Sequence, residues 1–386
     1  MPALDRRLSL DFNKWNSPKR RVLDILVIIV LGILLYAGLK PFHAPANGVH
    51  WLQNSSGIYL SGSGTIISSK MFLPSAHGRT LEIWIEPRRI DDQGTIVALY
   101  NPAAQRFFAL SQEESDLEMH TQSTNPWHKT TVSRLHLPDV FVRNKSSLWT
   151  VAVNPSGITV YRDATLTRKS AGFRISAEEF SGRLTIGTLP IFDNDWYGAI
   201  RGLAIFDRAL SAERIAQHYD AWSSLKEPKT DVADNCIALY IFDEHSGNIA
   251  HNRCDSDVKL YLPPKYVVLY PTALDPIWRA FEWKSWFWTD AAISFTGFIP
   301  FGFLLCACFS AHGLRRAALI AAIAGGIVSL LIEVVQTRLP TRDSSMSDLI
   351  MNFAGSATGA ALARPNIMRL IGSQGVTTQN PEMRQP

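Results

Sequence analysis

The sequence predicts a multidomain membrane protein: a four-helix α transmembrane bundle with an all-β sandwich inserted after its first helix. Two observations predict this fold class. Apolar residues gather in four windows, one near the N-terminus and three near the C-terminus, and the long stretch between them has the short alternating runs of a water-soluble β domain. Of the 386 residues, 19% are charged, which is below the roughly 25% of an average soluble protein.

The first apolar window, residues 22–39, is predicted to be transmembrane helix 1. Its 18 residues contain one charge, Asp24, and at 1.5 Å per residue they cross most of a ~30 Å hydrocarbon layer. The N-terminal segment 1–21 ends in a basic run, and Pro41 ends the helix. A cleaved signal peptide is the alternative, but the run exceeds the usual 7–15 residues and no small-residue cleavage site follows, so we expect a retained anchor.

Transmembrane helices 2 to 4 are predicted within residues 291–364, in the windows 291–309, 317–336 and 346–363. Basic residues flank the helices on one side of the membrane if there are four spans; they are Arg6, Arg7, Lys14, Lys19, Arg20, Arg21, Arg315, Arg316, Arg364 and Arg369. We therefore expect residues 1–21 and the tail 365–386 in the cytoplasm and residues 46–270 outside it. The net charge of +4 is too mild to indicate a nucleic-acid partner.

Residues 271–290 form an aromatic juxtamembrane segment before the second helix. Its indoles suit the headgroup level of a membrane, and they belong to Trp278, Trp283, Trp286 and Trp288. Packing into the preceding domain is the alternative interpretation.

The four cysteines fit this topology. Cys236 and Cys254 lie in the exported segment, where an oxidising compartment lets them form a disulfide worth about 3 kcal/mol. Cys306 and Cys308 lie in the second predicted helix and point to different faces, so we expect buried apolar thiols there.

Residues 46–270 read as an antiparallel β-sandwich because Gly, Pro, Asn and Asp separate short alternating runs such as GTIVALY, LWTVAVN and GITVYRD. One short helix is expected over residues 211–219, with Ser211 as its N-cap.

These runs resemble the laminin-G-like, concanavalin A-like sandwiches. The resemblance is carried by TLEIWIEP (80–87), SLWTVAV (147–153), GITVY (157–161) and GAIRGLAIFDRALSAERI (198–215). That family includes carbohydrate binders, protein binders and a few hydrolases, so the resemblance implies a fold more than a ligand.

A glycosidase site on this strand is disfavoured. Glu82 and Glu86 flank Trp84 on one strand and project about 13 Å apart at ~3.3 Å per residue, whereas the carboxyl pairs of glycosidases lie ~5.5 Å or ~6.5–9.5 Å apart. The aliphatic residues between them suit the core-facing side, so we expect Glu82 and Glu86 to be solvated charges.

A calcium ion is conceivable on four loop carboxylates, those of Asp91, Asp92, Asp193 and Asp195. Turn chemistry explains the same residues without a metal, and we expect no cofactor.

Polar residues recur near the predicted outer ends of the last two helices. Glu333 and Gln336 share a helix face, and the next helix carries a stripe made of Asp348, Asn352, Gly355 and Gly359. A short connection makes the two helices antiparallel neighbours. We expect one membrane polar pocket, which consists of Glu333, Gln336, Arg338, Arg342, Asp348 and Asn352.

This pattern resembles the VanZ-like family of small bacterial membrane proteins, named for a teicoplanin-resistance protein. The family's Pro-Phe-Gly element resembles Pro300 to Gly302, and Pro41-Phe42 resembles the end of its first span, whereas Ser294 and Phe295 stand where an Asn is expected. The resemblance implies that the sandwich is inserted into the first outer loop of a VanZ-like bundle in a bacterial inner (plasma) membrane. Gly355 and Gly359 bring a neighbouring helix close, and Pro300 and Gly302 belong with them to the helix packing.

Two roles remain open for the polar pocket. Arg342 could form a purely structural ion pair with Asp348 or Glu333, or Arg338 and Arg342 could contact the phosphate of a lipid-linked envelope intermediate. No catalytic motif appears, so catalytic residues are unknown and an enzyme is the less favoured class.

The sequence thus predicts a cell-envelope protein that binds glycan or another envelope component through its exported domain. The alternatives are a membrane enzyme or flippase-like factor acting on a lipid-linked precursor, a glycopeptide-resistance factor, or a docking platform for an extracytoplasmic protein. The expected partners are membrane lipid or lipid-linked glycan, and envelope polysaccharide or protein.

Overall fold

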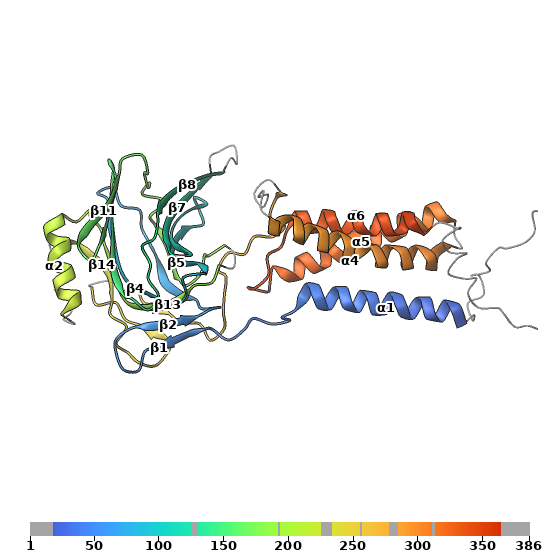
Figure 1. The fold of residues 1–386 in the computed structure, drawn as a ribbon, viewed down its shortest axis with the longest axis horizontal. Coiled ribbons are helices and arrows are strands. Elements are labelled where there is room, and N and C mark those ends of the chain that lie inside the picture. Colours follow the sequence, from blue (N-terminus) through green and yellow to red (C-terminus); the bar gives the residue numbers. More distant parts are fainter. Residues whose placement is uncertain are drawn as a thin grey trace, which may run out of the picture. The chain divides into compact units, whose positions relative to one another are not determined.

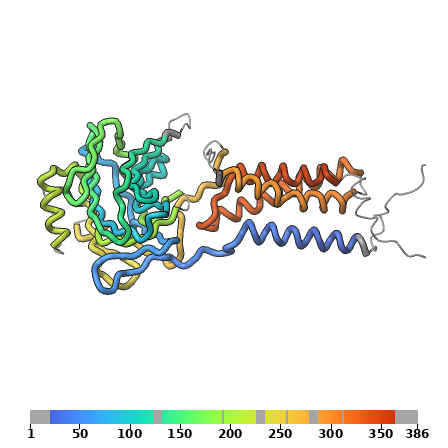
Figure 2. Tube along the Cα trace, viewed as in Figure 1, coloured from blue at the N-terminus to red at the C-terminus, as the bar shows by residue number. Residues whose placement is uncertain are grey.

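The computed structural model describes residues 18–124, 130–191, 194–224, 234–254, 257–277, 285–310 and 313–363. The chain folds as two compact units. Residues 43–271 form the β unit, and residues 1–42 together with 272–386 form the helical unit. Figure 1 labels many of the elements of both units, and Figure 2 follows the chain through them by colour.

The β unit is a sandwich of two antiparallel sheets. The first sheet has the order β1 (Val49–Trp51), β2 (Ile58–Ser61), β13 (Tyr197–Phe206), β4 (Arg79–Pro87), β9 (Ser147–Asn154), β10 (Gly157–Arg162) and β11 (Thr165–Ser170), and β14 (Cys236–Tyr240) also pairs with β13. The second sheet has the order β15 (Ile249–Ala250), β16 (Leu260–Tyr261), β3 (Ile66–Phe72), β12 (Gly182–Ile186), β5 (Gln93–Asn101), β6 (Arg106–Glu113), β7 (Asp116–Thr124) and β8 (Thr130–Leu137). The predicted β-sandwich followed by a helical C-terminal region is confirmed.

The core of the β unit lies between the sheets because side chains alternate along each strand. Ile83 of β4 and Val151 of β9 point inward to meet Leu99 and Phe108 from the second sheet, and Trp149 is fully buried among them. Burying each such aliphatic side chain stabilises the fold by about 1.5–3 kcal/mol.

Helix α2 (Ala212–Ser223) covers the outer face of the first sheet, where Figure 1 shows it beside β14 and β11. The Ser211 side chain accepts a hydrogen bond from the Arg214 backbone N–H, which confirms the predicted N-cap. Ile215 and Trp222 on its inner side pack against Phe206 of the sheet. This amphipathic face positions the site described below.

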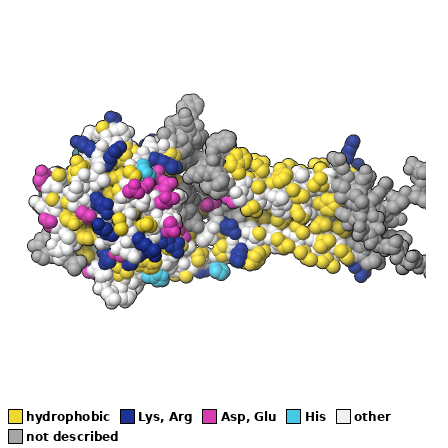
Figure 3. Space-filling view, in the orientation of Figure 1, with side chains coloured by type: hydrophobic (Ala, Val, Ile, Leu, Met, Phe, Trp, Pro, Cys, Tyr) yellow, Lys and Arg dark blue, Asp and Glu magenta, His cyan; other side chains and the backbone are white. Residues whose placement is uncertain are grey.

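The described part of the helical unit contains α1 (Pro18–Leu39), α4 (Ser285–Phe309), α5 (Leu314–Gln336) and α6 (Met346–Leu362). Helices α4, α5 and α6 pack against one another, and α1 packs on α4 and α5. Among the described residues, three helical segments are long and apolar enough to cross a membrane, namely 20–39, 287–309 and 314–336. Helix α6 has 17 residues and is shorter than these. Hydrophobic side chains cover most of the visible surface of this unit (Figure 3).

Glycines set the distance between α4 and α6. A Cβ on Gly355 would overlap the carbonyl oxygen of Phe295, and a Cβ on Gly359 would overlap that of Ile299. From the other helix, a Cβ on Gly302 would overlap the carbonyl oxygen of Ser356. The two backbones are therefore in direct contact at this crossing, as small residues allow. Pro300 lies inside α4 beside this contact.

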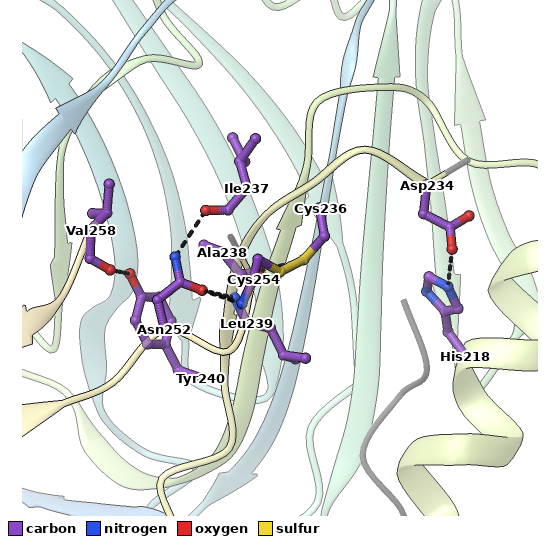
Figure 4. The surroundings of a disulfide bond; sticks show 10 residues. All are labelled: His218, Asp234, Cys236, Ile237, Ala238, Leu239, Tyr240, Asn252, Cys254 and Val258. Carbon is purple, nitrogen blue, oxygen red and sulfur yellow. Dashed lines mark hydrogen bonds and ion pairs between the residues drawn. A yellow bond between two sulfur atoms is a disulfide. The ribbon is translucent and has the colours of Figure 1, made fainter. Parts of the chain in front are cut away.

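The predicted disulfide is confirmed. Cys236 at the start of β14 is bonded to Cys254, across a sequence separation of 18 residues, and Figure 4 shows the bond beside the strand. Cys306 is buried, as expected. Cys308 differs from the expectation of apolar surroundings, because its half-buried thiol lies 3.8 Å from an Asp24 carboxylate oxygen of α1.

The aromatic segment predicted before the second helix lies partly outside the described residues. Trp278 and Trp283 fall there, and nothing is described of the Trp286 side chain. Trp288 is in α4, is 48% exposed and meets the ring of Phe287 edge-on.

Candidate functional site

The outer face of β4 carries a buried carboxylate. Because Leu81 and Ile83 point into the sandwich core, Glu82 points to the opposite face, beneath α2. Its oxygens accept hydrogen bonds from the ring of His218 at 2.9 Å and from the indole N–H of Trp222 at 3.0 Å. The expectation that Glu82 and Glu86 are solvated is wrong: they are 0% and 6% exposed, because α2 and neighbouring arginines cover them.

His218 is held between two carboxylates. Its Nδ1 donates to Glu82, and its Nε2 lies 3.5 Å from Asp234, as Figure 4 also shows. Arg214 forms a two-point ion pair with the same Asp234. Burial alone would lower the pKa of His218, but the hydrogen bond to Glu82 and the negative charges of Glu82 and Asp234 outweigh it, so the pKa is raised above 6.5. These two carboxylates therefore favour the protonated ring, and His218 links the sheet to the helix through its hydrogen bond to Glu82.

A cavity of about 540 Å³ opens beside this cluster. We call it the tryptophan pocket because Trp84 and Trp222 form part of its wall, with ring centroids 6.4 Å apart and the planes at 71°. Its other lining residues are mostly polar; they are Gln53, Asn54, Ser55, Ser56, Arg201, Ile241, Asp243 and His245. The Nε1 atom of Trp84 is buried and has no hydrogen-bond partner among the described residues.

A break in strand pairing creates the pocket. Residues 197–200 of β13 pair with β2, whereas residues 203–206 of the same strand pair with β14. A β-bulge between Ile200 and Gly202 lies between these two stretches and directs Arg201 to the outer face. A Cβ on Gly202 would overlap the Trp222 ring, so this glycine makes room for the pocket wall.

Arg201 is fixed by its neighbours. Its guanidinium donates to Glu86 at 2.6 and 3.1 Å and to the hydroxyl of Ser55 at 3.1 Å. Asp243, on the other side of the pocket, is paired with Arg253 at 2.8 Å. The tryptophan pocket thus combines the half-buried indole of Trp84, which meets the 6% exposed indole of Trp222, with fixed hydrogen-bonding groups. This is the chemistry that a polar ligand group with apolar faces requires.

The four loop aspartates considered for calcium do not form one cluster of metal ligands among the described residues. Asp195 accepts from the Ser63 backbone N–H and hydroxyl, and Asp92 accepts from the Gln93 N–H at 3.0 Å. Asp193 lies outside the described residues.

The polar residues predicted to line a membrane pocket lie at one end of the helical unit. Glu333 accepts from the Ser345 N–H at 2.7 Å, which ties the end of α5 to the start of α6. Asp348 accepts a hydrogen bond from the Ser294 hydroxyl of α4 at 2.9 Å. Ser294, which stands where the VanZ-like pattern has an Asn, therefore contacts a residue of that pattern. Asn352 donates to Ser329 of α5 at 2.9 Å.

Gln336 and Arg342 contact the end of α1. Gln336 donates to the carbonyl oxygen of Gly38 at 2.9 Å, and Arg342 donates to those of Lys40 and Ala37 at 2.6 and 3.1 Å. Within the described ranges, Arg342 forms no ion pair with Glu333 or Asp348, because the exposed carbonyls that end α1 occupy its guanidinium. Arg338 lies in the connection between α5 and α6, where its backbone N–H donates a hydrogen bond to the Val335 carbonyl oxygen at 3.0 Å.

Sequence reasoning missed most of the tryptophan pocket. Trp222, Arg201 and Asp243 were not candidates, and Trp84 was named only as the residue between Glu82 and Glu86. His218 and Trp222 follow Ile215 by three and seven residues, and this amphipathic spacing could have indicated a buried helix face that carries a histidine.

Comparisons with known proteins agree with this architecture. The model of the concanavalin A-like lectin/glucanases superfamily (laminin G type) matches residues 60–216, and the VanZ/LLP1 model matches residues 236–369. The chain therefore joins a laminin-G-like part to a VanZ-like part, as the sequence motifs predicted. The VanZ/LLP1 match begins at Cys236, so it includes β14 to β16 of the β unit as well as α4 to α6.

Solved structures with low identity also match. A native heptameric SAP-like pentraxin from Limulus polyphemus has a TM-score of 0.35 at 11% identity, covering 57% of this chain and 93% of its own. A putative carbohydrate binding protein from Bacteroides ovatus has a TM-score of 0.39 at 13% identity, covering 53% and 57%. The botulinum neurotoxin serotype D binding domain has a TM-score of 0.33 at 16% identity, covering 45% and 46%. The chain thus spans about half the length of the last two proteins. No curated protein matches it.

Proposed function

We propose that this protein is a membrane-anchored, glycan-binding component of a bacterial cell envelope. The tryptophan pocket is the observation that carries the proposal. Sugar rings have apolar C–H faces and polar hydroxyl edges, and a pocket with two indoles, an arginine and a carboxylate complements both. The β unit would hold the glycan, and the helical unit would keep it at the membrane.

The membrane part of the proposal rests on helix length and charge. Segments 20–39, 287–309 and 314–336 have the length and apolarity of transmembrane helices. Helix α6, at 1.5 Å per residue, reaches about 26 Å and lies at the lower limit for crossing a bilayer. With α1 and α4 both crossing the membrane, the basic residues that begin α1 and α5 lie on the same side, which is the cytoplasmic side by the positive-inside rule.

The polar residues of the helical unit fit a structural role in this proposal. Glu333, Asp348 and Asn352 link α4, α5 and α6, and Arg342 and Gln336 link these helices to the end of α1. Apart from Gln336 Oε1, which is buried without a hydrogen-bond partner among the described residues, these side chains are paired within the unit, as groups near a membrane interior require.

The test is glycan binding by the full chain in detergent micelles. Trp84→Ala removes one indole face of the pocket, and we expect it to weaken retention on isolated cell-wall polysaccharide by about tenfold or more. Tyr261→Ala is the matched control, because it removes a 40% exposed aromatic ring from β16 in the other sheet. Equal retention of the wild-type protein and both variants would contradict the proposal, as would no retention of the wild-type protein on any envelope glycan.

A further inference from the structure

A second hollow lies on the outer face of the first sheet, with a volume of about 430 Å³. We call it the arginine pocket. Its described lining contains Arg88, Arg89 and Arg143 together with the rings of Tyr59 and Tyr197, and it contains no carboxylate. Three guanidinium groups around one hollow attract a negatively charged group.

The two pockets lie along the same strand. Trp84 and Glu86 point outward from β4, and Arg88 follows after two more residues, so each step advances about 6.6 Å. Arg88 adjoins the second pocket through its backbone N–H, which donates to the carbonyl oxygen of Tyr197 at 3.2 Å.

Glu86 connects the pockets electrostatically. It accepts from Arg201 of the tryptophan pocket at 2.6 Å and from Arg88 of the arginine pocket at 2.9 Å. One carboxylate, whose side chain is 8% exposed, is therefore shared by two guanidinium groups. This sharing leaves an excess of positive charge between the two hollows and fixes the orientation of both arginines.

The remaining arginines differ in how they are held. Arg89 lies 3.8 Å above the Tyr197 ring and 3.5 Å from Asp92, so it is positioned but partly neutralised. Arg143, in the exposed connection before β9, forms no ion pair with any described carboxylate. Arg143 also lines a smaller hollow with Asp91 and Asp92. Because Glu86 is paired with Arg88 and Asp92 with Arg89, Arg143 supplies the positive charge that the described ion pairs leave unbalanced in this pocket.

We propose that the arginine pocket binds an oxyanion group, either carboxylate or phosphate, on the same glycan whose sugar ring occupies the tryptophan pocket. The ligand class is then an acidic glycan, not a neutral one. This inference rests on the proposed glycan-binding function and adds the charge of the ligand. Arg143 and Arg88 contact the oxyanion, Arg89 is held over Tyr197 beside it, and Glu86 sets the spacing between the two subsites.

The test compares matched ligands that differ only in charge. Full-length protein in detergent micelles is titrated with oligogalacturonate and its methyl ester, and with phosphomannan and dephosphorylated mannan. We expect the acidic member of at least one pair to bind about tenfold more tightly, with an advantage that shrinks in about 0.5 M salt. A preference within the first pair identifies carboxylate as the recognised group, and one within the second identifies phosphate.

Variants assign the preference to the pocket. Arg143→Gln is expected to weaken binding of the acidic ligand about tenfold and to leave the neutral ligand unchanged. Arg168→Gln is the matched control, because it removes the same charge from an exposed position on β11.

The outcomes separate this inference from the function on which it rests. Equal binding of acidic and neutral ligands, with Trp84→Ala weakening both, overturns the acidic specificity and keeps glycan binding. An acidic preference that Arg143→Gln and Arg168→Gln reduce equally also overturns the inference, since the effect is then net charge. Absence of binding to all four ligands by the wild-type protein counts against both.

Discussion

His218 is a histidine ring enclosed by the carboxylates of Glu82 and Asp234, with Arg214 on the far side of Asp234. Its folded-state pKa is raised above 6.5, so the stabilisation from the charged ring is fully present below the unfolded-state value and is lost as the pH rises through the folded-state value. We predict that the free energy of unfolding of the β unit falls with rising pH above about 6.5.

The measurement is urea unfolding of the full chain, followed by tryptophan fluorescence from about pH 6.5 to about pH 8.5. His218→Gln should lower the unfolding free energy by about 1–3 kcal/mol at the acid end and remove the slope. His136→Gln, which removes a histidine that is 49% exposed, should keep the slope. His120 does not disturb this measurement. Burial and the charge of Arg134 lower its pKa to about 4, so its contribution, which makes stability rise with pH, falls below pH 6.5. A slope unchanged in His218→Gln would contradict the assignment.

At the scale of secondary-structure elements, the contact between α4 and α6 depends on the absence of side chains. Gly359→Ala places a Cβ against the backbone of Ile299, so we predict that the helices separate and that stability falls by about 1–3 kcal/mol. Gly32→Ala in α1 is the control, because no atom lies within 4 Å of its Cβ position and alanine favours the helix. Thermal unfolding in detergent measures both variants. If Gly359→Ala and Gly32→Ala unfolded at the same temperature, the crossing of α4 and α6 would be looser than described.

Secondary-structure elements were predictable from the sequence where the signal comes from residues close together in the chain. Alternation identified the strands, Ser211 identified the start of α2, and the spacing of Gly355 and Gly359 indicated a close helix crossing because each depends on neighbours within a few residues. The buried carboxylate was not predictable in this way. Glu82 meets His218 across 136 residues, and alternation indicates which face a residue occupies but not what covers that face. Likewise, Arg342 contacts carbonyls at the end of α1, about 300 residues earlier, and not the nearer carboxylates that were considered as possible ion-pair partners.

At the scale of the whole molecule, the proposal requires the β unit and the loop between α4 and α5 to lie on opposite sides of the membrane. Each can carry a single reporter thiol in a chain with Cys306 and Cys308 replaced by alanine. Lys145 is exposed in the connection before β9, and Arg315 lies in the first turn of α5. Both are basic surface positions, so the two substitutions are matched in chemistry.

We predict that a membrane-impermeant maleimide labels Lys145→Cys in intact spheroplasts and labels Arg315→Cys only after permeabilisation, because the positive-inside rule holds the arginines of the α4–α5 connection in the cytoplasm. Cys236 and Cys254 should stay unlabelled in both cases until a reductant is added, since an exported disulfide has no free thiol. The reverse labelling pattern would place the tryptophan and arginine pockets in the cytoplasm, away from any envelope glycan, and would remove the basis of the proposed function. Labelling of both positions in intact cells would instead place them on the same side of the membrane, with α4 lying along the membrane surface instead of crossing it.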